Sequence, residues 1–166
     1  MAKGDQRRSR KGMGQVLIIG YGNPLRSDDG FGWQASRWIA RELAGHNAEV
    51  ITCHQLTPEL AEPLSRCSLA VFIDAEAGGE PGDIHCREVR PQVPSSAALA
   101  HTSSPAGLLA SAAQLYGRCP QAIAITVSAQ YFDLGESLSS AVSEALPKVV
   151  ERVVQFACPG GLRPES

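Results

Sequence analysis

The sequence predicts a single α/β domain, a three-layer αβα sandwich with helices on both faces of a mostly parallel, twisted sheet of about five strands. Short apolar runs such as Val16–Ile19 and Leu69–Ile73 lack polar alternation, which indicates strands buried on both faces. Segments with helical spacing separate these runs, and strands that alternate with helices are typical of a parallel sheet. A chain of 166 residues fits one such domain.

Each predicted element has a local justification. Apolar or β-rich runs predict strands at 16–19, 49–53, 69–73 and 123–127, the third of which ends at Asp74, and a weakly alternating edge strand at 84–89. Thr57-Pro58 and Ser104-Pro105 each place a capping hydroxyl before a proline that suits the first helical position. Helices are therefore predicted to start at Thr57 and at Ser104. Helical spacing predicts two more, from Asp28 or Asp29 to Leu43 and from Ser137 or Ser139 to Phe156.

Charge is distributed unevenly along the chain. Residues 1–14 hold five cations and one anion, and the other 152 residues hold 10 cations and 16 anions. An acidic body is poorly suited to nucleic-acid phosphates, so we expect no nucleic-acid partner. The basic segment lacks an apolar or aromatic partner that would let it pack. We therefore expect a disordered tail at 1–14, one domain at 15–158 and a second disordered tail at 159–166.

Cysteine usage and hydropathy predict a cytoplasmic protein. The five cysteines are widely spaced and form no C-x-x-C pair, a pattern that fits neither a disulfide framework nor a zinc ribbon, although one catalytic cysteine remains open. No apolar run approaches the roughly 18 residues that cross a bilayer, so we expect no membrane association. Arg7-Arg8 precedes only a four-residue apolar run, too short for an export signal.

Three sets of ionisable residues follow predicted strands or precede a helix. They are Asp28 and Asp29, Asp74, and His101. Ligands of open parallel sheets bind beyond the carboxyl ends of the strands, where these side chains could converge. Two carboxylates and one imidazole suit a divalent transition metal such as nickel, zinc, copper or iron, with positions left open for substrate. Taken singly, each has a structural alternative: a helix cap for Asp28 or Asp29, a satisfied strand-end carboxylate for Asp74, and a capping loop residue for His101.

The turn after the first strand also raises a nucleotide-binding hypothesis. Gly20-Tyr21-Gly22 begins like a dinucleotide fingerprint, but Leu25 stands where the third glycine belongs. Asp28 and Asp29 occupy the helix start, where a phosphate would need positive potential. The loop chemistry therefore argues against a nucleotide enzyme.

Four segments resemble the hydrogenase maturation proteases, the endopeptidases that trim the C-terminus of the large subunit of nickel-iron hydrogenases. Residues 19–32, IGYGNPLRSDDGFG, look like the N-terminal signature of that family. Matches follow in order at Phe72-Ile73-Asp74-Ala75 with Gly79-x-Pro81-Gly82 behind it, at His101-Thr102-Ser103, and at 135–139. The resemblance spans nearly everything from Val16 to about Phe156.

The resemblance implies a site, a substrate and a fold. In the family, the residues that match Asp29, Asp74 and His101 bind nickel, and they are the catalytic candidates here. The implied fold is phosphorylase/hydrolase-like. The implied partner is a hydrogenase large-subunit precursor, which would itself supply the nickel to a monomeric protease.

The expected activity is removal of the precursor's C-terminal extension after nickel insertion. No serine or cysteine stands next to an evident base, which favours a hydrolase of aspartic or metal-assisted type. The alternative is a maturation chaperone that recognises the nickel site without cutting, because the same residues would bind the metal in both cases.

Overall fold

A computed structural model describes residues 14–93 and 104–160. The strands are β1 (Val16–Tyr21), β2 (Ala48–Cys53), β3 (Leu69–Ala77), β4 (Ile84–Val89) and β5 (Gln121–Ala129). The helices are α1 (Phe31–Glu42), α2 (Ala61–Arg66), α3 (Pro105–Tyr116) and α4 (Ser140–Ala157), with 3-10 turns η1 (Ser27–Gly30) and η2 (Pro58–Leu60). Nearly all of the two predicted tails, and the predicted ligand His101, lie outside the described residues.

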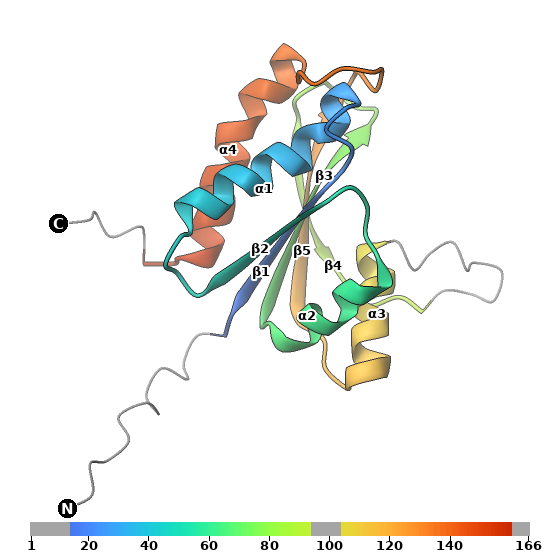
Figure 1. Cartoon of the computed structure of the whole chain (residues 1–166), viewed down its shortest axis with the longest axis vertical. Helices are drawn as coiled ribbons and strands as arrows, with labels where there is room; N and C mark the ends of the chain where they lie inside the picture. Colours follow the sequence, from blue (N-terminus) through green and yellow to red (C-terminus); the bar gives the residue numbers. More distant parts are fainter. Residues whose placement is uncertain (1–13, 94–103, 161–166) are drawn as a thin grey trace, which may run out of the picture.

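The five strands form one sheet in the order β2-β1-β3-β5-β4 (Figure 1). The β1–β2, β1–β3 and β3–β5 pairs are parallel, and β4 pairs antiparallel with β5 at the edge. This arrangement confirms the predicted mostly parallel sheet. Because β1 and β3 are central neighbours, the residues that follow them meet at the same edge of the sheet.

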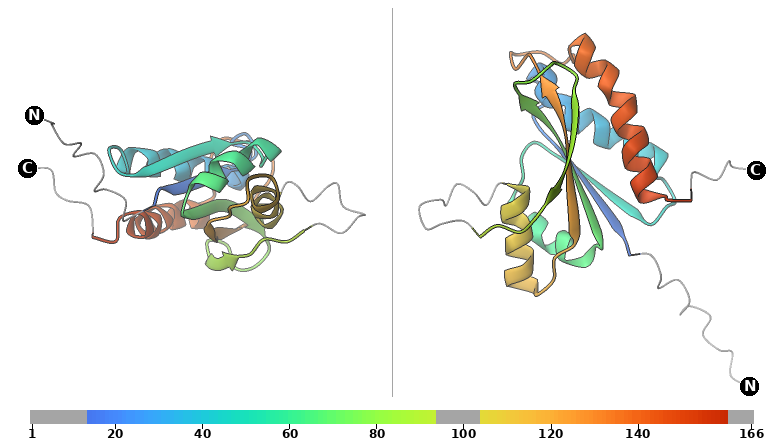
Figure 2. Two further views of the ribbon diagram at one scale, coloured as in Figure 1. Left: turned by 90° about the horizontal axis from the view of Figure 1, so that it is seen from below. Right: turned by 180° about the vertical axis from the view of Figure 1, so that it is seen from behind.

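Helices cover the sheet on both sides, which makes the three predicted layers (Figure 2). On one face, α1 and α4 pack on odd-numbered β3 residues such as Val71 and Ile73. On the other face, α2 and α3 pack on Ala70 and Phe72. Among the described residues, no helix is both long enough and apolar enough to span a membrane.

The structure corrects the predicted ends of three strands: β1 continues past Ile19 to Tyr21, and the larger corrections are in β3 and β5. β3 continues past Asp74 to Ala77, and β5 continues past Val127 to Ala129, with the two strands paired along the whole extension. The extension was missed because its polar and small residues do not form an apolar run. Asp74 is therefore inside β3, although it still lies beyond the last residue of β3 that pairs with β1.

The first helix lies directly on the backbone of β1 and β3 because of Gly32. A Cβ atom placed on Gly32 would overlap the carbonyl oxygens of Tyr21 and Ile73. Gly20 makes a similar approach from the strand side, where a Cβ would overlap the carbonyl oxygen of Gly32. These glycines therefore serve helix-to-sheet packing in a turn that resembles a nucleotide fingerprint.

We expect Gly32→Ala to lower the free energy of unfolding by roughly 2–4 kcal/mol, because backbone atoms of two strands must move to admit the methyl group. Gly160→Ala is the matched control, since a Cβ there meets nothing within 4 Å. Urea denaturation of both variants measures the difference. Equal unfolding free energies would contradict the close packing.

Candidate active site

The turn after β1 brings Asp29 back over the end of that strand. Gly22 adopts φ +139°, a conformation that favours glycine, and the chain leaves the sheet there. Asp29 sits in η1, and its Oδ2 accepts a hydrogen bond of 2.9 Å from the Asn23 N–H. The carboxylate is half-buried, so it is held in place and still open to a ligand.

Asp74 lies in β3 beside the end of β1, next to Tyr21. Its Oδ1 accepts a hydrogen bond of 2.8 Å from the Ala75 N–H, and the Tyr21 phenol donates a second hydrogen bond to the carboxylate. Burial raises the pKa of Asp74 from 3.8 to about 7 against these two hydrogen bonds, and the nearby charges of Asp29 and Glu76 add to the rise. Such a carboxyl group can exchange a proton near neutral pH.

The Tyr21 phenol is held in its neutral form. Burial raises the pKa of Tyr21 far above its usual value, and the negative charge of Asp74 and the hydrogen bond to it raise the pKa further. Tyr21 therefore acts as a hydrogen-bond donor to Asp74 at all ordinary pH values.

The neighbouring Asp28 has a different role, as an internal anchor. It is fully buried, and its Oδ2 accepts hydrogen bonds from the N–H groups of Gln130 and Tyr131 at 3.1 and 3.0 Å. Ser139 donates twice, from its N–H to Oδ1 at 2.7 Å and from its hydroxyl to Oδ2 at 2.9 Å. Burial opposes ionisation of Asp28, but these hydrogen bonds outweigh it and lower the pKa. Asp28 thus joins η1 to the loop that leads into α4.

A row of polar side chains crosses the sheet at the level of Asp74. Tyr21 pairs with Cys53 in the β1–β2 register, Asp74 pairs with Thr126, and Thr126 pairs with His85. Residues paired in this way point to one face of a sheet, here the face that α2 and α3 cover farther down the strands. One row of side chains, one from each of the five strands, therefore crosses this face of the sheet, and Asp74 is its central member.

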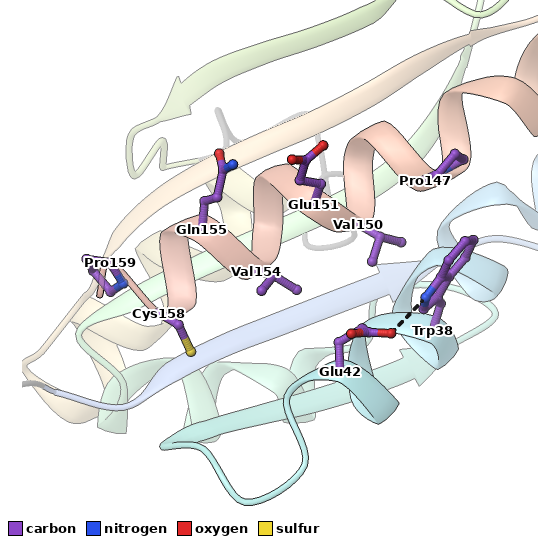
Figure 3. A pocket seen from close by; sticks show the side chains of 9 residues that line it. All are labelled: Trp38, Glu42, Pro147, Val150, Glu151, Val154, Gln155, Cys158 and Pro159. Carbon is purple, nitrogen blue, oxygen red and sulfur yellow. Dashed lines mark hydrogen bonds between the residues drawn. The ribbon is translucent and has the colours of Figure 1, made fainter. Parts of the chain in front are cut away.

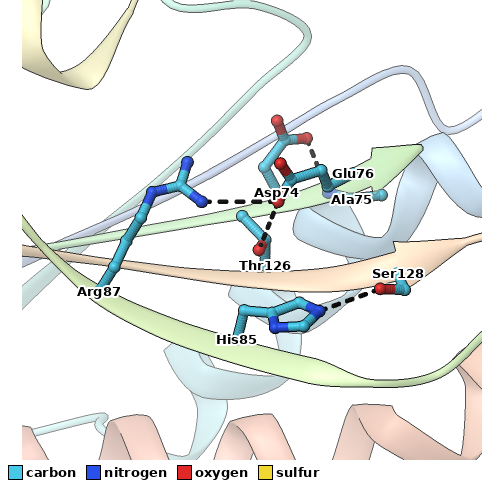
Figure 4. Close-up of polar contacts among 7 residues, drawn as sticks. All are labelled: Asp74, Ala75, Glu76, His85, Arg87, Thr126 and Ser128. Atoms are coloured by element: carbon cyan, nitrogen blue, oxygen red, sulfur yellow. Dashed lines mark hydrogen bonds and ion pairs between the residues drawn. The ribbon is translucent and has the colours of Figure 1, made fainter. Parts of the chain in front are cut away.

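Further polar contacts link this row to Glu76, Arg87 and Ser128 on β3, β4 and β5 (Figure 4). Glu76 accepts a hydrogen bond of 3.0 Å from the Thr126 hydroxyl and pairs with Arg87 at 3.5 Å, and His85 Nε2 lies 3.1 Å from the Ser128 hydroxyl. These side chains border a pocket of about 350 Å³ beside the Gly78–Gly79 turn. These residues were not predicted as part of the site, although period-two alternation from Asp74 and within β4 could have placed Glu76, His85 and Arg87 on one face.

Two of the three predicted ligands lie at the same edge of the sheet, and the charge of Asp29 contributes to the raised pKa of Asp74. The predicted third ligand, His101, lies outside the described residues. Within 14–93 and 104–160, no group of three or more histidine, cysteine, aspartate or glutamate side chains could hold a metal ion. The Asp29–Asp74 pair alone supplies two oxygen ligands, and a metal would need further donors from elsewhere.

A separate apolar groove lies between α1 and α4 (Figure 3). Its volume is about 530 Å³, and its lining includes Trp38, Val150, Val154 and Cys158. Glu42 and Cys158 mark the C-terminal ends of the two helices, so the groove reaches toward the end of the sheet opposite Asp29 and Asp74. Its two carboxylates, Glu42 and Glu151, stand on helices and not at a strand end, so the candidate active site remains at the carboxyl edge of β1 and β3.

No protein-family model and no curated protein matches this sequence. Solved structures do resemble the fold. HycI, a NiFe hydrogenase maturation protease from Thermococcus kodakarensis KOD1, superposes with a TM-score of 0.69 at 20% identity, over 86% of this chain and 92% of that protein. HybD from Thermococcus kodakarensis, also a NiFe hydrogenase maturation protease, superposes with a TM-score of 0.62 at 24% identity, over 86% of this chain and 99% of that protein.

A bacterial structure gives the same result. The hydrogenase maturating endopeptidase HybD from E. coli superposes with a TM-score of 0.68 at 17% identity, over 89% of this chain and 94% of that one. The similarity extends over nearly the whole of each protein, so it concerns the complete domain. The chain therefore has the fold of the nickel-iron hydrogenase maturation proteases.

Proposed function

We propose that this protein is an endopeptidase that removes the C-terminal extension of a nickel-iron hydrogenase large-subunit precursor after nickel insertion. The observation that carries the proposal is the placement of Asp29 beside Asp74 at the carboxyl edge of the sheet. The resemblance of the segments around Asp29, Asp74 and His101 to the family, and the shared fold, support it. The protein would act as a monomer in the cytoplasm.

Nickel enters this proposal as part of the substrate. Asp29, Asp74 and His101 would bind the nickel already inserted in the precursor, so that only a loaded precursor is held in position. Imidazole and carboxylate groups are suitable nickel ligands, and the precursor's own ligands would complete the shell. Selectivity would then come from the metal.

The proposed reaction is hydrolysis of one peptide bond. A metal ion next to the scissile bond can polarise its carbonyl or lower the pKa of a bound water. A carboxylate, Asp29 or Asp74, accepts the proton from the attacking water and returns it to the leaving amine as the C–N bond breaks.

The experiment is incubation of the wild-type protein with nickel-loaded and nickel-free precursor, followed by mass spectrometry of both precursors. We expect the loaded precursor to lose a C-terminal fragment and the nickel-free precursor to keep its mass. A loaded precursor that binds but keeps its mass would contradict the peptidase and favour the non-catalytic maturation chaperone.

A further inference from the structure

Among the described residues, the last part of β3 next to the candidate site has no strand partner on the side of β1. The β1–β3 register ends at Gly20 and Ile73, whereas β3 continues to Ala77 and pairs with β5 through its last residue. Within the described part of the chain, β5 is the only strand that pairs with residues 74–77. Gly22, at φ +139°, turns the chain out of line with β1 beside this edge.

Backbone groups of the extension face that open edge. The Ala75 N–H donates to the Asp74 carboxylate. Alternate residues of a strand direct their backbone groups to the same side, so the N–H and C=O of Ala77 face the same way as those of Ala75. The C=O of Ala75 and the N–H and C=O of Ala77 can therefore form hydrogen bonds with a partner strand.

We propose that residues 74–77 form a strand-addition site that binds the extended segment of the precursor around its scissile bond. This inference rests on the proposed function and adds the binding mode. An exposed strand edge is a template for an extended peptide, which binds through main-chain hydrogen bonds.

The position of the edge identifies this occupant. A peptide in line with β1 would run past Asp74, the first residue of the open edge, and past Asp29, which folds back over Gly22. Main-chain pairing would hold the scissile bond next to both carboxylates with little dependence on the peptide's side chains. The exposed side chain of Glu76 follows on the same strand, and it lines the 350 Å³ pocket together with residues of β4 and β5.

Ala77→Pro tests the proposal, because proline removes the N–H that would donate to the peptide and is tolerated where the N–H of an edge strand faces outward. Ala77→Val is the matched control, since it keeps the N–H at an exposed position. We expect the Kd for nickel-loaded precursor to rise about tenfold in A77P, roughly the loss of one hydrogen bond, and to stay within about twofold in A77V. Equal affinities of two folded variants would overturn the strand-addition site.

Hydrogen exchange of the wild-type chain gives a second test that does not depend on how A77P folds. We expect slower exchange of the amides in 75–79 when nickel-loaded precursor is added, and unchanged exchange there would overturn the proposal. Both tests measure binding of the precursor and do not depend on its cleavage. A wild-type protein that binds and shows this protection without cutting would therefore refute the peptidase activity and support the strand-addition site.

Discussion

Asp74→Asn should reduce kcat/KM for nickel-loaded precursor by about 10²- to 10⁴-fold, the range expected for loss of a general base. The amide keeps the size of the carboxyl group but cannot accept the proton from water, and it is a weaker metal ligand. Asp133→Asn is the control, because that aspartate is exposed. Single-turnover cleavage, followed by mass spectrometry, measures both. Wild-type rates in D74N would remove Asp74 from the proposed mechanism.

The same substitution should stabilise the fold at alkaline pH. The pKa of Asp74 is about 7 in the folded protein against a usual value of 3.8, so the unfolded chain releases this proton first and ionisation destabilises the fold as the pH rises through this range. We expect the free energy of unfolding of D74N to be about 1–2 kcal/mol higher than that of the wild type at pH 8. Near pH 4 the two values should differ little. A less stable D74N at pH 8 would show that the carboxylate is a structural group.

Asp28→Asn should destabilise the protein by roughly 2–4 kcal/mol at pH 7. The buried carboxylate accepts four hydrogen bonds, and an amide in its place must direct an NH₂ group at one of these donors. The effect depends on pH because the folded-state pKa is lowered: the stabilisation is present above about pH 4 and is lost as the pH falls through that lowered value. Urea denaturation at pH 7 and pH 3 measures the difference.

D133N is again the control, since it changes the same group at an exposed position. If D28N and D133N unfold with equal free energies at pH 7, the network around Asp28 does not stabilise the fold. We also expect D28N to weaken cleavage, because Asp28 anchors the η1 turn that carries Asp29.

Buried strands were the most predictable part of this fold. Val16–Ile19 and Leu69–Ile73 are fully or almost fully covered by helices on both faces, apart from the half-buried Leu69, so their apolar runs directly record the burial. The outer ends of β3 and β5, residues 74–77 and 128–129, were missed because Asp74, Glu76 and Ser128 are polar residues typical of loops. Strand pairing in three dimensions, rather than local pattern, keeps these residues extended.

The candidate site was predictable to the level of segments, and less so to the level of single side chains. Asp28 and Asp29 are adjacent acidic residues of the same type, and the η1 turn, entered through Ser27 at φ +51°, buries Asp28 and leaves Asp29 half-buried against the Asn23 N–H. Tyr21 belonged to the recognised segment, but its hydrogen bond to Asp74 depends on the β1–β3 register. The roles of Asp29, Asp74 and His101 as nickel ligands stay a prediction.

The affinity ratio between nickel-loaded and nickel-free precursor tests the central claim most directly. It should be measured for the wild type and for Asp29→Asn, Asp74→Asn, His101→Gln and the control Asp133→Asn. We predict a wild-type preference of at least about tenfold for the loaded precursor, equivalent to 1.4 kcal/mol. D133N should keep that preference, and each of the other three variants should lose it. An unchanged preference in all three would contradict nickel recognition by these residues.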